Sequence, residues 1–176
     1  MEEKKIHIHF NENIVRKQLW QYFYYSWKKK LPVHLMNLFY ALLAIFIFDS
    51  LFSNKSRYDF LRFTTTFLGI AFIVCLINFF YQKANYSNKM NKHIDELKGY
   101  HPITEFIFDE ESIHIKCEQY DIRSIWGKIT YEVSNKMILI HIDMNTIFTY
   151  LISEDETDKY AEILEILQRK ARQKGK

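Results

Sequence analysis

The sequence predicts a membrane protein in which a hairpin of two transmembrane helices anchors a mainly antiparallel β domain with one C-terminal amphipathic helix. Two apolar runs, residues 33–53 and 63–81, are each long enough to cross a bilayer as a helix. Short alternating segments separated by turn residues follow from residue 103, and a helical pattern ends the chain. The 176 residues therefore divide into an N-terminal segment 1–30, the hairpin 33–81, a stalk 82–98 and a domain 99–176.

The N-terminal segment begins with a strand pattern. From Lys4 to Phe10, apolar residues alternate with His7 and His9, which places the two histidines on one face of a strand. Two histidines with this spacing could bind a metal ion, but no third ligand lies nearby in the sequence. We therefore expect an exposed polar face here, and no metal or other cofactor in the chain.

A helix is expected from Asn11 to Lys30, on the cytoplasmic side, with Asn11 or Asn13 as its N-cap. Aromatic rings followed by lysines are typical of a helix that lies at the lipid headgroups. The residues that this interpretation places near lipid are Trp20, Tyr24, Trp27, Lys28, Lys29 and Lys30. The pattern also fits a helix that packs on the soluble domain, so both interpretations stay open.

The first apolar run, 33–53, contains Asp49 as its only acid. At 1.5 Å per residue, about twenty residues span roughly 30 Å, which is the thickness of the hydrocarbon core. Acids inside a bilayer are costly and often mark ion paths. Because Asp49 is a few residues from the outer end of the run, we expect it to reach the interface, with a functional intramembrane role as the alternative.

The second apolar run, 63–81, carries no charged residue. Only residues 54–62 separate it from the first run, so the two helices should form a hairpin with a short outer loop. Polar residues 82–98 can continue the second helix as a stalk up to Gly99, and Pro102 prevents helix beyond it. Two helices buried in a soluble core are the alternative, but each run exceeds the usual length of a core helix.

Basic residues are denser at the inner ends of the predicted spans than in the outer loop. The loop holds Lys55, Arg57 and Arg62, whereas the inner flanks hold Arg16, Lys17, Lys28, Lys29, Lys30, Lys83, Lys89, Lys92 and Lys98. Because basic residues accumulate on the cytoplasmic side, we expect both termini in the cytoplasm and the chain integral to the inner cell membrane. The polar, charged first thirty residues argue against a cleaved signal peptide.

The domain from residue 99 contains six strand patterns, joined by turn residues. They cover residues 103–108, 112–117, 121–126, 129–134, 137–143 and 146–152. Alternation assigns one face of the second and fourth strands to the core. The residues on these two faces are Ile113, Ile115 and Cys117, and Ile129, Tyr131 and Val133.

A helix is expected over 153–172 at the end of the chain. Ser153 and Glu156 have the spacing of a capping box, and basic residues stand at the end of the helical pattern. Six antiparallel strands followed by one helix are the order of a pleckstrin-homology-like (PH-like) barrel. If the N-terminal strand pairs with these strands, it supplies a seventh, since a lone strand would be unstable.

Two stretches of the β domain carry a family resemblance. One runs from Ser124 to Ile129 and includes Trp126, and the other is the strand pair 138–152 that follows it. Together with the order of parts, they resemble the YcxB-like family of small bacterial membrane proteins over nearly the whole chain. The resemblance implies an N-terminal strand and helix, a two-span hairpin and a PH-like domain, with Trp126 and Ile129 as structural positions. Family members often carry a proline-basic pair where this chain has residues 150–153.

No residues in the sequence have the arrangement of a catalytic site, so we expect no enzymatic activity. The mixed charge of the soluble part argues against nucleic-acid binding. We expect an interaction module, anchored in the lipid bilayer, whose cytoplasmic domain binds a protein, a peptide or a lipid headgroup at the inner leaflet. The alternative is an immunity or stress-resistance protein that acts through its hairpin against a membrane-targeting toxin or antimicrobial. Transport would require several copies of so small a hairpin, so a homo-oligomer stays open.

Overall fold

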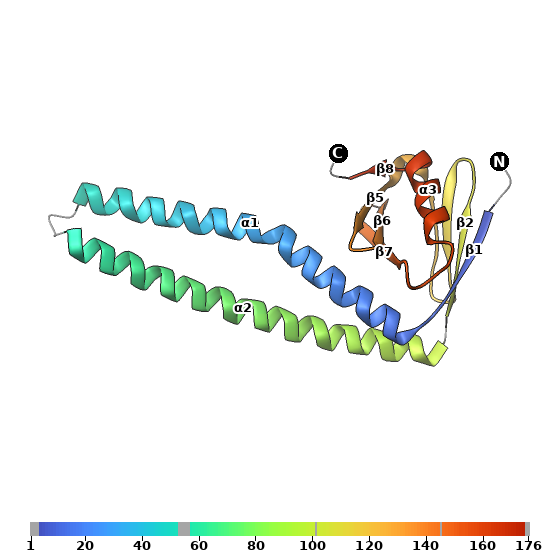
Figure 1. Cartoon of the computed structure of the whole chain (residues 1–176), viewed down its shortest axis with the longest axis horizontal. Helices are drawn as coiled ribbons and strands as arrows, with labels where there is room; N and C mark the ends of the chain where they lie inside the picture. Colours follow the sequence, from blue (N-terminus) through green and yellow to red (C-terminus); the bar gives the residue numbers. More distant parts are fainter. Residues whose placement is uncertain (1–3, 53–56, 101, 145, 175–176) are drawn as a thin grey trace. The chain divides into compact units, whose positions relative to one another are not determined.

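The computed structural model describes residues 4–52, 57–100, 102–144 and 146–174, without the side chains of 48–52 and 57–61. The side chain of Asp49 and the loop residues 54–56 therefore lie outside the described residues. Figure 1 shows the elements, which are β1 (Lys4–His9), α1 (Glu12–Phe52), α2 (Arg57–Tyr100), β2 (Ile103–Phe108), β3 (Ser112–Lys116), β4 (Asp121–Ile125), η1 (Trp126–Lys128), β5 (Ile129–Ser134), β6 (Met137–Met144), β7 (Thr146–Ser153), α3 (Tyr160–Lys170) and β8 (Arg172–Gln173). They form two units, a composite domain made of Met1–Tyr22 and Met90–Lys176, and a helical hairpin, Phe23–Lys89.

The two long helices are unbroken. α1 joins the predicted helix 11–30 and the predicted first span 33–53 into one helix, with Pro32 inside it. Pro32 has no N–H, so the helix continues past one missing hydrogen bond. α2 likewise joins the second span and the stalk. α2 begins at Arg57, so the first residues of this helix belong to the predicted outer loop 54–62.

The middle parts of α1 and α2 expose large apolar side chains. Val33, Phe39, Phe72 and Ile77 are 60%, 59%, 64% and 63% exposed. Both helices contain a stretch that is long and apolar enough to cross a membrane, and neither stretch is buried against other described residues. A soluble protein would turn such apolar surface toward a core. By length and composition, the two helices are candidate membrane spans.

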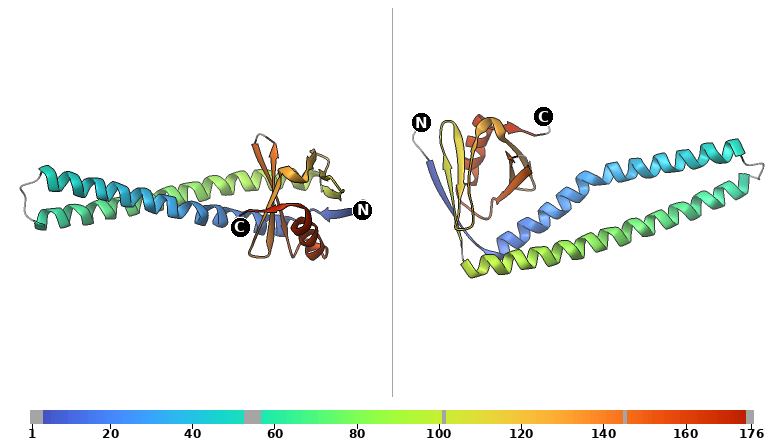
Figure 2. Two further views of the ribbon diagram at one scale, coloured as in Figure 1. Left: turned by 90° about the horizontal axis from the view of Figure 1, so that it is seen from above. Right: turned by 180° about the vertical axis from the view of Figure 1, so that it is seen from behind.

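The composite domain contains two four-stranded sheets. The first has the order β1-β2-β3-β4 with antiparallel neighbours. The second has the order β7-β6-β5-β8, in which β8 is parallel to β5 and the other neighbours are antiparallel. β1 lies along β2 (Figure 2). In this pairing Ile6 is opposite Phe106, and Ile8 is opposite Thr104. The expected pairing of the N-terminal strand with the later strands is therefore confirmed.

One apolar core joins the two sheets and α3. Its members include Phe106 from the first sheet, Ile140 from the second and Leu167 from α3, all with no exposed surface. In β1 and β2 the buried residues recur at every second position, which explains the alternation in the sequence. The core therefore holds together segments from both ends of the chain.

Most of the predicted core residues are buried in this core, namely Ile113, Ile115, Ile129 and Tyr131. The prediction is wrong for Val133, which is 44% exposed. Val133 is one residue from the end of β5. The neighbouring strand β8 pairs with β5 only at Thr130 and Tyr131, so it does not reach Val133. Cys117, which follows the end of β3, is only partly buried.

The strand bounds agree with prediction to within one residue, but the last helix does not. Trp126, expected at the end of a strand, begins the short helix η1. The helix expected over 153–172 begins only at Tyr160 and ends at Lys170. Ser153 is the last residue of β7 and pairs with Met137, and residues 154–156 form a turn in place of a first helical turn. After Lys170 the chain is extended and forms β8.

A two-residue turn joins β5 and β6. Both of its residues, Asn135 and Lys136, have positive φ, 50° and 61°. Positive φ at both central positions is the conformation of a type I′ turn, whose twist matches that of an antiparallel strand pair. The predicted hairpin loop at these residues is thus confirmed.

Candidate functional site

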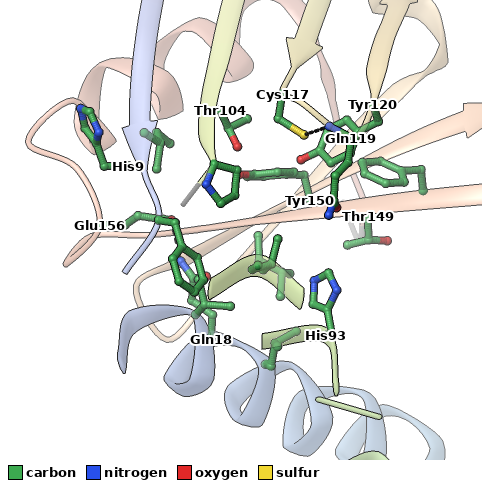
Figure 3. Close-up of a pocket in the computed structure, with 18 residues that line it drawn as sticks. His9, Gln18, His93, Thr104, Cys117, Gln119, Tyr120, Thr149, Tyr150 and Glu156 are labelled. Carbon is green, nitrogen blue, oxygen red and sulfur yellow. Dashed lines mark hydrogen bonds between the residues drawn. The ribbon is translucent and has the colours of Figure 1, made fainter. Parts of the chain in front are cut away.

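The composite domain contains a cavity of about 240 Å³ (Figure 3). The segment before the hairpin supplies one part of its wall, from β1 and the first turns of α1. The segment after the hairpin supplies the rest, from the end of α2, β2, the loop between β3 and β4, β7 and the turn that follows β7. The cavity therefore depends on segments that are distant in the sequence.

The periodicity of each element determines which side chains face the cavity. On α1, Val15, Gln18 and Leu19 follow a spacing of three and four residues, which places them on one face of the helix. On α2, His93 and Leu97 are four residues apart and share a face for the same reason. Helix faces with this spacing can line a cavity without any change in backbone geometry.

One side of the cavity is aromatic and carries hydroxyl groups. The rings of Tyr120 and Phe148 are 5.8 Å apart, and the ring of Tyr150 meets Phe106 edge to face at 5.0 Å. Burial raises the pKa of Tyr150 to about 12 and raises the pKa of Tyr120 as well, while hydrogen bonds with Thr104 lower both values in part. Both tyrosines therefore keep their protons at neutral pH.

The opposite corner of the cavity contains a carboxyl group, Glu156. The side-chain amide of Gln18, which is 4% exposed, donates hydrogen bonds to Oε2 of Glu156 at 2.6 Å and to Oγ of Ser153 at 3.1 Å. The backbone N–H of Ser153 also donates to Glu156 Oε2, at 3.4 Å. The contact predicted from the capping-box spacing thus forms, but it closes a turn after β7 and does not start a helix.

Burial raises the pKa of Glu156 to about 7, and the Gln18 and Ser153 hydrogen bonds offset only part of this rise. The two neighbouring acids differ from it. Asp155 forms an ion pair with Lys17, and Glu154 lies 2.7 Å from Nζ of Lys136. The Lys17 ammonium lowers the pKa of Asp155. Glu156 therefore differs from Glu154 and Asp155, because its hydrogen-bond partners, the Gln18 amide and the Ser153 N–H, are uncharged.

The polar groups of the cavity lining are hydroxyl groups, the amides of Gln18 and Gln119, the imidazoles of His9 and His93, and one carboxyl, on walls that are otherwise largely apolar. Such a mixture is common in cavities that hold small molecules. Beside them, Sγ of Cys117 accepts a hydrogen bond of 3.4 Å from the backbone N–H of Gln119 (Figure 3). Throughout the described part of the chain, no group of three or more His, Cys, Asp or Glu side chains is placed to hold a metal ion.

The predicted lipid-proximal residues lie outside the cavity lining. Trp20 is partly buried in the composite domain, whereas Tyr24, Trp27, Lys28, Lys29 and Lys30 belong to the helical hairpin. In the hairpin, Trp27 packs on Phe79 with ring centres 5.1 Å apart, and Lys83 Nζ is 5.9 Å from the ring centre of Tyr24. Their contact with lipid stays a prediction. The first turns of α1 pack on the composite domain, as the alternative interpretation of this helix proposed.

The two residues singled out by the family resemblance have structural positions away from the cavity. Trp126 is 9% exposed, stacks on Phe108 and donates from Nε1 to the carbonyl oxygen of Asp109 at 3.1 Å. Lys170 donates to the same oxygen at 2.8 Å, with its Nζ 5.6 Å from the centre of the Trp126 ring. Ile129 is 1% exposed in the core. Trp126 therefore fixes the loop between β2 and β3 against the start of β5.

The sequence predicted neither the cavity nor its carboxyl corner. Two signals were present: the spacing of Val15, Gln18 and Leu19, which is a helix face with one polar residue among apolar ones, and the capping-box spacing of Ser153 and Glu156. Comparisons of the chain with protein-family models, with curated proteins and with solved structures gave no match. The cavity and the exposed apolar helices are accordingly the features from which a function can be proposed.

Proposed function

We propose that the chain is a non-catalytic interaction module that two transmembrane helices anchor at the inner leaflet of the cell membrane. The main observation in support of this proposal is that α1 and α2 are each one continuous helix. Each helix contains a stretch long and apolar enough to cross a membrane, and each also supplies side chains to the cavity wall. The proposed anchor and the candidate binding site are therefore built from the same two helices.

The β domain, in this proposal, is PH-like. Support comes from the order of its elements, with four antiparallel strands in one sheet, three in the next and then a helix. β1 supplies the first strand from before the hairpin, and β8 is an addition at the edge of the second sheet. The resemblance to the YcxB-like family, whose parts occur in the same order, agrees with this assignment.

Both termini lie in the cytoplasm in this proposal. The denser basic residues at the inner ends of the spans support this orientation. The ring contacts of the hairpin support it as well, because Lys29 and Lys83 each lie within 6 Å of the centre of a tyrosine ring, at 5.6 and 5.9 Å. Amphipathic rings beside lysines suit the headgroup level, where the rings meet lipid and the ammonium groups meet phosphate.

A first experiment tests the anchor and the orientation. The full chain, with a reporter fused to its C-terminus, is expressed in bacterial cells, and the membranes are washed with alkaline carbonate. We expect the chain to stay with the membrane and a reporter that works only in the cytoplasm to be active. Release by carbonate would contradict the anchor, and activity of a periplasmic reporter would contradict the orientation.

A second experiment tests the interaction. A photo-crosslinking amino acid replaces Gln119, an exposed residue at the cavity, and in a matched variant it replaces Arg169, an exposed residue of α3 away from the cavity. We expect a defined protein or lipid adduct from position 119 and none from position 169. The absence of any adduct at 119, or equal yields at both positions, would count against the module. Protection of cells from a toxin by the hairpin alone would favour the immunity function instead.

A further inference from the structure

The cavity has room for a small organic molecule. Cavities that hold drug-sized ligands measure roughly 300–1,000 Å³, and this one measures about 240 Å³. A folded protein or a long peptide cannot enter it, whereas a small compact group can. Its occupant is therefore a small molecule, or one end of a larger one.

The charges around the cavity favour a cationic occupant. Three successive acids follow β7, and the structure gives Glu154 and Asp155 a lysine each. Among the described residues, the groups that stabilise the ionised form of Glu156 are the Gln18 amide and the Ser153 N–H, which are both uncharged. A partly buried carboxylate without a positive partner is costly, so a ligand that brings one gains an ion pair.

The opposite wall favours the body of such a ligand. Tyr120, Phe148 and Tyr150 line the cavity, and aromatic faces attract both apolar groups and organic cations. The protonated hydroxyls of the two tyrosines add hydrogen-bonding groups without adding charge. An anionic ligand, by contrast, would meet the carboxylate of Glu156 and no lysine or arginine in the lining, whose basic groups are the imidazoles of His9 and His93.

We propose that the cavity binds a small organic ammonium ion, whose charged head pairs with the Glu156 carboxylate while its apolar body lies against Tyr120, Phe148 and Tyr150. The inference deepens the proposed function, since it rests on the cavity being the binding site of the module and names the class of ligand. An ammonium group can belong to a free amine or to an ethanolamine headgroup of a phospholipid. The chemistry at Glu156 is the same for both.

The test compares three probes of matched shape on the full chain in a non-ionic detergent at pH 8, which is above the pKa of about 7 of Glu156. The probes are 2-phenylethylamine, which is cationic, 2-phenylethanol, which is neutral, and phenylacetate, which is anionic. We expect the amine to bind about tenfold more tightly than the alcohol, which corresponds to about 1.4 kcal/mol, and phenylacetate to bind more weakly still. Equal affinities for the three probes would overturn the proposal.

Two variants assign the preference to the carboxylate. Glu156→Gln keeps the shape of the side chain and removes its charge, so the preference for the amine over the alcohol should disappear. Glu154→Gln is the matched control, because Glu154 is exposed and pairs with Lys136, and it should keep the preference. Loss of the preference in both variants, or in neither, would contradict the assignment. Because all probes partition into detergent alike in both variants, the comparison is independent of the micelle.

A third variant tests the location of the site by filling the cavity. Val15→Phe adds a ring on the α1 face that lines the cavity and leaves Glu156 in place. It should weaken binding of the amine and of the alcohol together, at least tenfold. Undiminished binding to a folded Val15→Phe chain would place the probes elsewhere and overturn the proposal. Near-ultraviolet circular dichroism of each variant verifies that the domain is folded.

The source of the ammonium group is identified in nanodiscs. The amine is titrated into the full chain in discs with and without ethanolamine-headgroup lipid. Weaker apparent binding in the first discs indicates that the headgroup competes for the site, and equal binding indicates a free amine; both outcomes support the ammonium site. If no probe binds while the position-119 adduct forms as expected, this inference fails and the proposed module stands.

Discussion

Substituting Ile6 tests whether the N-terminal strand is a structural part of the β domain. Ile6 is 4% exposed, belongs to the common core and lies opposite Phe106, which has no exposed surface. Removing three carbons from such a site costs about 3 kcal/mol, from the lost transfer energy and from the cavity left behind. For a domain of about a hundred residues, 1 kcal/mol shifts the melting temperature by about 4 °C. Ile6→Ala should therefore lower the melting temperature by roughly 12 °C.

The measurement is thermal unfolding of the full chain in detergent, followed by near-ultraviolet circular dichroism. The control is His7→Ala, because His7 is exposed on the other face of β1. Its only described ion pair is a 3.9 Å contact with Glu105, and such surface changes stay within about 0.5 kcal/mol. If Ile6→Ala and His7→Ala melted at the same temperature, β1 would not be part of the core, and the composite domain as described would be refuted.

Three further predictions concern the β domain. Folding raises the pKa of Glu156 from 4.5 to about 7, so the folded chain binds the proton of this carboxyl more tightly than the unfolded chain does. The free energy of unfolding gained in this way is fully present below pH 4.5 and is lost as the pH rises through about 7. Glu156→Gln should therefore change little at pH 4.5 and stabilise the chain by up to about 3 kcal/mol at pH 8, as unfolding curves at the two pH values would reveal. Lys136→Gly should raise the melting temperature by a few degrees, because glycine adopts the φ of 61° without strain. The control is Glu154→Gln, which removes only the ion pair with Lys136 and should not raise the melting temperature. Trp126→Phe should cost about 1 kcal/mol in denaturant unfolding, because it removes the hydrogen bond to the Asp109 carbonyl but keeps an aromatic ring in place; an unchanged midpoint would show that this bond adds nothing.

Local patterns made the strands of this chain predictable. Inward-facing residues such as Ile113 and Ile115 alternate with polar ones, and this period of two follows directly from the geometry of a strand. The turn at Asn135 and Lys136 was predictable because asparagine tolerates positive φ. The apolar stretches within the two long helices were equally evident, since they need no partner in order to be recognised.

The start of α3 was not predictable, because the contact between Glu156 and the N–H of Ser153 is the same in a helix N-terminus and in a simple turn. Glu156 accepts from the N–H of Ser153 both in a capping box and in the turn that this chain forms. The two differ in the chain after Ser153, which here forms a turn over residues 154–156 and becomes helical only at Tyr160. The cavity was hidden for a related reason. Its carboxyl corner depends on Gln18, which is 138 positions away from Glu156, and no local pattern encodes such a contact.

The interruption of the β domain by the helical hairpin has a consequence for the order of events during synthesis. Ile6 and its partner Phe106 are one hundred positions apart. A ribosome that adds roughly 5–20 residues per second makes β2 on the order of 5–20 s after β1. Both apolar stretches are translated within that interval, so membrane insertion of the proposed hairpin would come before closure of the first sheet. Until then the residues that form β1, Lys4–His9, have no partner strand to cover their apolar side chains. Formation of the composite domain, and of its cavity, would therefore mark a chain whose two spans have already been inserted.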